Sequence, residues 1–255
     1  MRELCLGGLL VFVTGCVPNG PASSADAGAN PASSAAQRPK SPPPVVARPT
    51  GSSPSSAPSP PLGTGFEDNF ERDTPGPDWI LTGGDWRIAG GRLCVKGARN
   101  HGAWLNRTLP TNARIEFDAA SDSPDGDIKA EIFGDGTSAA AGVSYNDATS
   151  YLTIFGGWKN SFHVLARLNE HASDRPEIRI APGSDDERAR PVSVGQTYHF
   201  KIERADGKTL TWWVGGMQMF KFVDPQPLSG PGHDHLGFND WEVPVCFDNL
   251  KVVAL

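Results

Sequence analysis

Residues 114–119 read RIEFDA, and charged and apolar side chains alternate along this stretch without interruption. A period of two residues is typical of a β-strand, because successive side chains of a strand point to opposite faces of its sheet. The same alternation recurs in residues 127–132, 162–168 and 198–203. The sequence therefore predicts a series of strands, each with one face on a core and the other face toward solvent.

Glycine-rich turns separate the predicted strands. Ala89-Gly90-Gly91, Asp206-Gly207 and Gly215-Gly216 have the composition of compact hairpin turns. No window of a dozen residues in this part of the chain has the 3.6-residue period of an amphipathic helix. These patterns predict an all-β domain, and so many short antiparallel strands favour a sandwich or a barrel.

The composition of the chain changes sharply near Gly65. All seven Trp and all three Tyr lie beyond this residue, whereas residues 17–62 consist mainly of Pro, Ser, Ala and Gly. A segment of that composition buries too little apolar surface to fold. We therefore expect a disordered tether over residues 16–62, which begins with Cys16, and one folded domain over residues 63–255.

The N-terminus has the features of an export signal. Arg2 precedes a short apolar run at residues 6–13, which is far shorter than the ~20 residues of a membrane-spanning helix. This pattern predicts a signal peptide over residues 1–15. Residues 13–16, VTGC, resemble the bacterial lipobox, and this resemblance implies that Cys16 becomes the acylated first residue of the mature protein. The alternative is an ordinary signal peptide with an incidental cysteine.

The lipobox resemblance also implies a location. An acylated Cys16 would attach the exported protein to a membrane of the bacterial cell envelope, since several buried acyl chains give durable anchoring. Val17 follows this cysteine, and the Asp that retains enterobacterial lipoproteins at the inner membrane is missing at that position. We therefore expect an outer-membrane location.

The chain has four cysteines, and two of them belong to the export signal. If Cys5 leaves with the signal peptide and Cys16 is acylated, Cys94 and Cys246 remain as a pair in the folded domain. Disulfides persist outside the reducing cytosol, so we expect a Cys94–Cys246 bridge. Two buried free thiols are the alternative.

The charge of the chain argues against a nucleic-acid partner. The net charge is −6, and the sequence contains no stripe of Lys and Arg. A phosphate-binding surface needs such a stripe, and we therefore expect no DNA or RNA ligand.

Several phrases of the domain are similar to one superfamily. They are DNF at residues 68–70, WRIAGGRL at 86–93, YHFKIER at 198–204, LTWWVGG at 210–216 and VCFDNLKV at 245–252. Together they resemble the concanavalin A-like lectin/glucanase superfamily, and most of all its laminin-G-like and 3-keto-disaccharide-hydrolase-like jelly rolls. The resemblance implies a two-sheet antiparallel jelly-roll sandwich with the first and last strands as neighbours, which would bring Cys94 near Cys246.

The same resemblance raises the question of catalysis. Glucanases of the superfamily carry an E-x-D-x-x-E strand, and Glu116 and Asp118 match its first two acids. Ser121 stands in place of the third acid, and serine cannot protonate a leaving group at neutral pH. Glu131 on another strand is a candidate for the missing carboxyl. The alternative is a solvated strand face with alternating charges.

A turn with three carboxylates is a candidate calcium site. Asp122, Asp125 and Asp127 lie within six residues of each other. Ca²⁺ prefers such hard oxygen ligands, although a solvated turn has the same composition. Calcium is the one cofactor that the sequence suggests.

Two aromatic and polar stretches, at residues 151–163 and 230–241, predict a ligand-binding surface. Aromatic rings stack on the apolar faces of sugars, while fixed polar groups bind the hydroxyls. The alternative is a pair of structural loops. The candidate binding residues are Trp158, His163, His233, His235, Asn239, Asp240 and Trp241.

The leading hypothesis is an exported lipoprotein that displays a non-catalytic carbohydrate-binding jelly roll, with a glycan or polysaccharide as its ligand. A glycoside-processing hydrolase that uses Glu116, Asp118 and Glu131 is the first alternative. A structural or protein–protein interaction domain is the second.

Overall fold

The alternating stretch that begins near Arg114 forms strand β6 (Ala113–Ser121) of a large antiparallel sheet. The computed structural model describes residues 58–255, so the expected signal peptide, the lipidation site at Cys16 and nearly all of the tether lie outside the described residues. No helix in the described part of the chain is long and apolar enough to cross a membrane.

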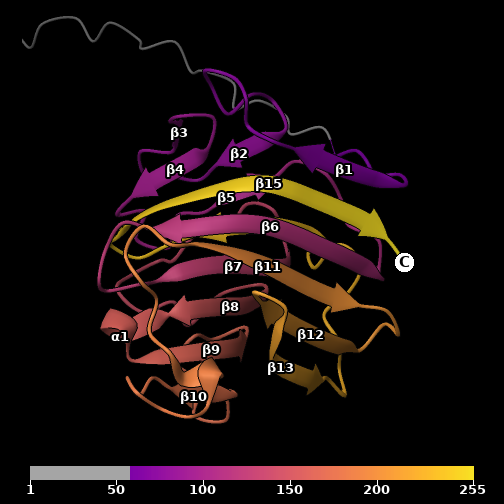
Figure 1. The fold of residues 1–255 in the computed structure, drawn as a ribbon. Coiled ribbons are helices and arrows are strands. Elements are labelled where there is room, and N and C mark those ends of the chain that lie inside the picture. The colour runs from indigo at the N-terminus through magenta and orange to yellow at the C-terminus, as the bar shows by residue number, and fades with distance from the viewer. Residues whose placement is uncertain (1–57) are drawn as a thin grey trace, which may run out of the picture. The chain divides into compact units, whose positions relative to one another are not determined.

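The first sheet has eight strands, and β15, β6, β11, β12 and β13 lie side by side in it (Figure 1). Strand β1 pairs with β15, so the first and last strands are neighbours as expected. Besides β6, its strands are β1 (Gly65–Asp68), β3 (Arg87–Ile88), β4 (Leu93–Lys96), β11 (Thr197–Arg204), β12 (Thr209–Val214), β13 (Met217–Val223) and β15 (Pro244–Ala254).

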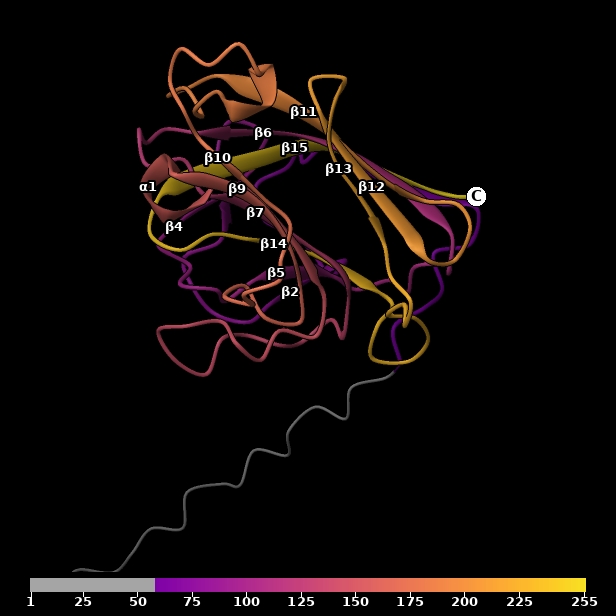
Figure 2. The same ribbon diagram turned by 90° about the horizontal axis from the view of Figure 1, so that it is seen from below.

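The second sheet has seven strands and lies against the first as a separate layer (Figure 2). Its order is β10-β9-β8-β7-β14-β5-β2, and all pairs are antiparallel. Its strands are β2 (Trp79–Leu81), β5 (Ala103–Leu105), β7 (Ile128–Gly134), β8 (Tyr151–Gly156), β9 (Phe162–Arg167), β10 (Glu177–Arg179) and β14 (His235–Asn239). The predicted two-sheet antiparallel sandwich is confirmed.

Aromatic side chains fill the space between the sheets. Phe238 of β14 stacks on Phe247 of β15 with ring centroids 4.2 Å apart, and Phe117 of β6 stacks on Phe200 of β11 at 4.8 Å. The inward residues of the alternating segments supply this core, which accounts for the period of two in the sequence. The predicted Cys94–Cys246 disulfide is present between directly paired residues of β4 and β15.

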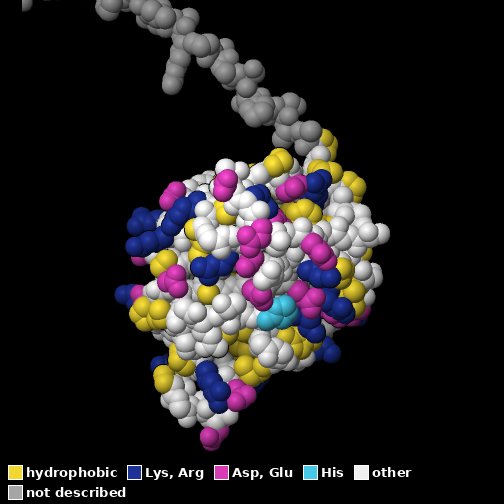
Figure 3. Space-filling view, turned by 45° about the horizontal axis from the view of Figure 1, so that its top comes forward, with side chains coloured by type: hydrophobic (Ala, Val, Ile, Leu, Met, Phe, Trp, Pro, Cys, Tyr) yellow, Lys and Arg dark blue, Asp and Glu magenta, His cyan; other side chains and the backbone are white. Residues whose placement is uncertain are grey.

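The prediction that each strand has a solvent face was wrong for β7, which is buried along its whole length, and for the middle of β9, where four consecutive residues are buried. Strand β8, for which no alternation was predicted, is also buried throughout. The outer face of β8 and β9 carries a second apolar cluster. Segment 135–150, between β7 and β8, contributes Ala140, Tyr145 and Ala148 to this cluster and so covers the face. On the face of the domain shown in Figure 3, acidic and basic side chains are interspersed.

Candidate functional site

A pocket of about 470 Å³ lies at one end of the covered face of the second sheet. Trp158, Trp241 and Val143 form its walls, and Val143 is 80 % exposed. The buried side chains of Asp127, Lys129 and Glu170 form what we call the floor, and they come from the start of β7 and from the segment after β9. Asp125, Lys159, His171 and Glu242 are the exposed charged or ionisable residues around it.

An unusual turn carries Trp158. The short element α1 (Gly157–Asn160) contains three consecutive residues with left-handed backbone angles, at φ 51° for Trp158, 56° for Lys159 and 57° for Asn160. Each non-glycine residue in this conformation costs about 1–2 kcal/mol. The side chain of Asn160 secures the turn, because it donates to the Val192 carbonyl at 2.8 Å and accepts from the Val192 N–H at 2.9 Å.

Backbone strain gathers around this pocket. Asp127 at φ 64° and the pair Arg99 and Asn100 at 51° and 60° are also left-handed. Strain of this kind persists where the surrounding structure fixes it, and it is concentrated at functional sites. The local conformation therefore marks the same end of the sheet as the pocket does.

An arginine lies over each tryptophan of the pocket. The guanidinium carbon of Arg175 lies 4.3 Å from the ring centroid of Trp158, and that of Arg99 lies 5.9 Å from Trp241. His171 makes an edge contact with Trp158 at 5.6 Å. These contacts fix the orientation of the rings and cover part of their surface.

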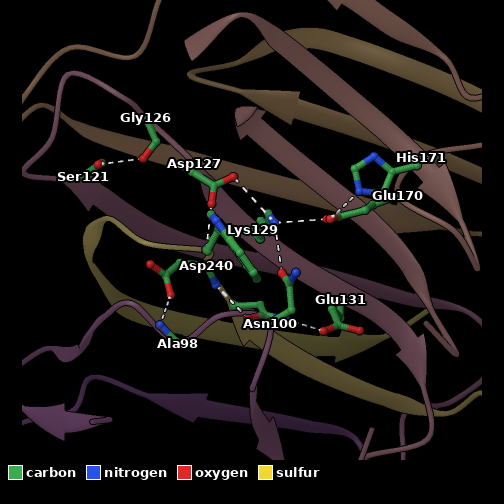
Figure 4. Close-up of polar contacts among 12 residues, drawn as sticks. Ala98, Asn100, Ser121, Gly126, Asp127, Lys129, Glu131, Glu170, His171 and Asp240 are labelled. Carbon is green, nitrogen blue, oxygen red and sulfur yellow. Dashed lines mark hydrogen bonds and ion pairs between the residues drawn. The ribbon is translucent and has the colours of Figure 1, made fainter. Parts of the chain in front are cut away.

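The floor is a buried ion cluster around Lys129 (Figure 4). The Lys129 Nζ donates to Asn100 Oδ1 at 3.0 Å and to Glu170 Oε2 at 3.1 Å, and lies 3.7 Å from Asp127 Oδ1. Although burial opposes its charge, the neighbouring carboxylates raise the pKa of Lys129 above its ordinary value. Glu170 Oε1 in turn lies 3.2 Å from His171 Nε2.

Asp127 joins the floor to the wall, because its Oδ2 accepts the backbone N–H of Trp241 at 2.7 Å. Asp240 lies behind this contact and accepts the N–H of Ala98 at 2.7 Å. Burial raises the pKa of Asp240 to about 7. The pocket therefore borders a region in which negative charge is already costly.

Glu131 does not line the pocket, but it holds the covering segment in place. Its Oε2 accepts from the hydroxyls of Ser150 at 2.7 Å and Tyr145 at 3.0 Å, and its Oε1 accepts from Asn239 Nδ2 at 2.7 Å. The carboxyl is fully buried, and burial raises its pKa to about 7 against these hydrogen bonds. The segment that bears Val143 is thus attached to β7 and β14 through one carboxyl.

The structure divides the predicted binding residues into two groups. Trp158 and Trp241 line the pocket, with Asn239 and Asp240 buried behind it. The three histidines do not line it. His163 is buried between Gly156 N–H and the Arg190 carbonyl, and burial lowers its pKa to about 4.

The other two histidines lie near the start of β14, at the end of the strand away from the pocket, and both contact neighbouring residues there. His233 Nδ1 lies 2.6 Å from the Thr149 carbonyl oxygen, and His235 is buried beside Gly136 and Asp234. The expectation that His163, His233 and His235 join the tryptophans in one surface is therefore corrected, because β14 and β9 direct these rings elsewhere.

The three candidate catalytic carboxyls do not converge. Glu116 and Asp118 lie on the outer face of β6 in the first sheet, where Asp118 pairs with His199 at 2.8 Å. Glu131 lies on the outer face of β7 in the second sheet. The apolar core separates these two faces, so the arrangement that the alternative hydrolase hypothesis requires is not formed.

The expected calcium ligands do not converge either. Asp127 turns inward to Lys129 and Trp241, whereas Asp122 and Asp125 are exposed. Among residues 58–255, no group of three or more His, Cys, Asp or Glu side chains is arranged to hold a metal ion. The prediction of a calcium site is therefore corrected: the turn places one carboxylate, that of Asp127, in the floor of the pocket.

Sequence reasoning singled out Asp127, as a calcium ligand, but missed the rest of the floor and part of the wall. Lys129 was expected on a solvated strand face, and Glu170, Arg175 and Val143 lie in irregular segments without a period. The adjacent Glu170 and His171 were the only local signal, and nothing in the sequence tells which strand they approach.

No protein-family model matches the sequence, and no curated protein matches it. Solved structures are similar in fold. The carbohydrate-binding module CBM66 from Bacillus subtilis matches with 16% identity and a TM-score of 0.50, over 69% of this chain and 96% of the module. A β-glucanase from Bacillus licheniformis matches with 8% identity and a TM-score of 0.51, over 76% of this chain and 99% of the enzyme. At these identities, the likeness shows a shared jelly-roll fold.

Proposed function

We propose that this protein is a carbohydrate-binding lipoprotein of the bacterial cell envelope, and that the pocket between Trp158 and Trp241 holds its sugar. One observation carries the proposal: two tryptophans from separate loops line one pocket above buried polar groups. A sugar ring has apolar C–H faces and a polar rim, and such a pocket complements both. The fold shared with a carbohydrate-binding module supports this proposal.

The charges of the floor favour binding over hydrolysis. A glycosidase needs two carboxyl groups that are free to act on either side of the scissile bond. Here the ammonium of Lys129 lies between the carboxylates of Asp127 and Glu170 and pairs with both. Both carboxylates are engaged with the same ammonium, and we therefore propose a site that binds without cleaving.

The membrane part of the proposal rests on residues 13–16 alone. An acyl chain on Cys16, followed by the Pro- and Ser-rich tether, would hold the domain at the membrane while letting it reach a glycan at a distance. The outer membrane is the proposed location.

A glycan array with the whole chain in detergent tests the proposal. We expect binding to a subset of glycans and a loss of ~10-fold or more in affinity for Trp158→Ala and for Trp241→Ala, as for an interface hot spot. Trp213→Ala is the matched control, because Trp213 lies on the first sheet and contacts Lys201 there. An array without signal, or binding that neither pocket variant weakens, would contradict the proposal.

A further inference from the structure

Lys129 is the only cation among the three residues of the floor, and it is paired with the two acids there. An ammonium has three N–H donors. Asn100 Oδ1 and Glu170 Oε2 accept two of them, and Asp127 Oδ1 lies 3.7 Å from the nitrogen on a third side. The charge of this lysine is therefore already opposed by two carboxylates before any ligand enters the pocket.

The carboxylates of the floor, in contrast, keep acceptor capacity. A carboxylate offers about four lone-pair sites. Asp127 accepts one hydrogen bond, from the Trp241 N–H, and is in ion-pair contact with Lys129. Glu170 accepts one from Lys129 and lies 3.2 Å from His171 Nε2. The floor thus presents free acceptors to a ligand that donates hydrogen bonds.

The charge of the pocket has the same sign as these acceptors. Four acids (Asp125, Asp127, Glu170 and Glu242) and two lysines (Lys129 and Lys159) line it, which gives a net charge of −2 with His171 neutral. Of the two nearby arginines, Arg99 cancels the charge of Glu242, so the net charge is −1 when this pair is counted, and Arg175 is paired outside the pocket. Arg99 pairs with Glu242 at 3.1 Å, and Arg175 pairs with Glu177 at 3.1 Å.

We propose that the pocket selects sugars that donate hydrogen bonds and carry no negative charge, with amino sugars preferred over neutral sugars and uronic acids excluded. This inference rests on the proposed carbohydrate-binding function and specifies its ligand class. Trp158 and Trp241 can stack on any hexose ring, so the acceptors of the floor determine which sugars the pocket prefers. A carboxylate on the ligand would lie near Asp127 and Glu170, whose two charges are opposed only by the single charge of Lys129. The other lining lysine, Lys159, lies at the exposed edge of the pocket, and an ammonium on the ligand would gain two acceptors at the floor.

Three matched sugars in each of two series test this inference. Whole protein in detergent is titrated by NMR or calorimetry with glucosamine, glucose and glucuronic acid, and with the three galactose counterparts, as short oligosaccharides. Because each series keeps one ring configuration, stacking is constant and only the charge varies. We expect the amino sugar to bind most tightly and the uronic acid at least ~10-fold more weakly than the neutral sugar in the series that binds. This gap should narrow at high salt.

The outcomes separate the two proposals. A uronic acid that binds as tightly as its neutral counterpart overturns the inference and leaves the carbohydrate-binding function intact. If no sugar of any charge binds here or on the array, both fail. Glu170→Gln should reduce the discrimination against the uronic acid, whereas Glu67→Gln on β1, which removes the same charge far from the pocket, should not. If the Glu170 variant fails to fold, the titrations of the unaltered protein with the matched sugars still test the inference.

Discussion

The guanidinium of Arg175 lies 4.3 Å above the ring of Trp158, and the same side chain donates to the backbone carbonyl of Glu170. One residue therefore connects the aromatic wall of the pocket to its floor. Because Trp158 lies on a strained left-handed turn, this contact helps to set the angle at which its ring meets a ligand.

Arg175→Gln should weaken sugar binding by roughly 3- to 10-fold, the scale of one cation–π contact of about 1 kcal/mol. The thermal midpoint of unfolding should also fall modestly, since the side chain is only 14% exposed and donates to the Glu170 carbonyl. The matched control is Lys201→Gln, which removes the cation 3.9 Å from Trp213 on the first sheet. Equal losses of affinity in the two variants would show that the Trp158 contact has no particular role.

The Cys94–Cys246 bridge should be the strongest single stabilising element of the domain. It joins residues 152 positions apart, in adjacent strands β4 and β15. Closing so long a loop in the unfolded chain costs it much entropy, so Cys94→Ala with Cys246→Ala should lower the free energy of unfolding by ~2–5 kcal/mol. Urea unfolding with and without reductant measures this cost. Reductant should destabilise the unaltered chain only, and an equal effect on the double variant would contradict the prediction.

Stability should decrease as pH rises through neutrality. Burial raises the pKa values of Glu131 and Asp240 to about 7, whereas in the unfolded chain both groups titrate near pH ~4. Between these values the folded state binds more protons than the unfolded state, so this contribution is fully present below pH ~4 and is lost as pH approaches and passes 7.

Urea unfolding at several pH values between 4.5 and 8.5 measures how the free energy of unfolding depends on pH. We expect a loss on the order of 1–3 kcal/mol across the range and a flatter profile for Glu131→Gln, which mimics the protonated carboxyl. Glu203→Gln, on an exposed ion pair of the first sheet, should keep the original slope. A Glu131→Gln profile that parallels that of the unaltered chain would show that this carboxyl does not titrate as expected.

Cys16→Ser should abolish membrane attachment. The variant is expected to lose incorporation of labelled palmitate and to move from the detergent phase to the aqueous phase on Triton X-114 partition, because serine cannot form the thioether that carries the lipid. Cys5→Ser is the control, since this residue lies within the expected signal peptide and should leave the labelling unchanged. Label that persists in Cys16→Ser would remove the lipoprotein part of the proposed function.

Local patterns predicted much of the fold. The alternation around Ile115 and Phe117 identified β6 and its inward face, and the count of cysteines identified the Cys94–Cys246 pair. The first prediction depends on the rule that successive side chains of a strand point to opposite faces. The second depends on the count of two cysteines that remain if Cys5 leaves with the signal peptide and Cys16 is acylated.

The sequence by itself also indicated Trp158 and Trp241 as binding residues, from their turn and loop settings. It did not determine that Lys129 and Glu131 are buried, nor that Glu170 reaches Lys129. Alternation specifies two faces of a strand, but which segment covers the second face depends on contacts between residues distant in the chain. Only the tertiary structure decided that segment 135–150 covers β8 and β9, and that two acids and a lysine at the end of this face form the floor of a pocket.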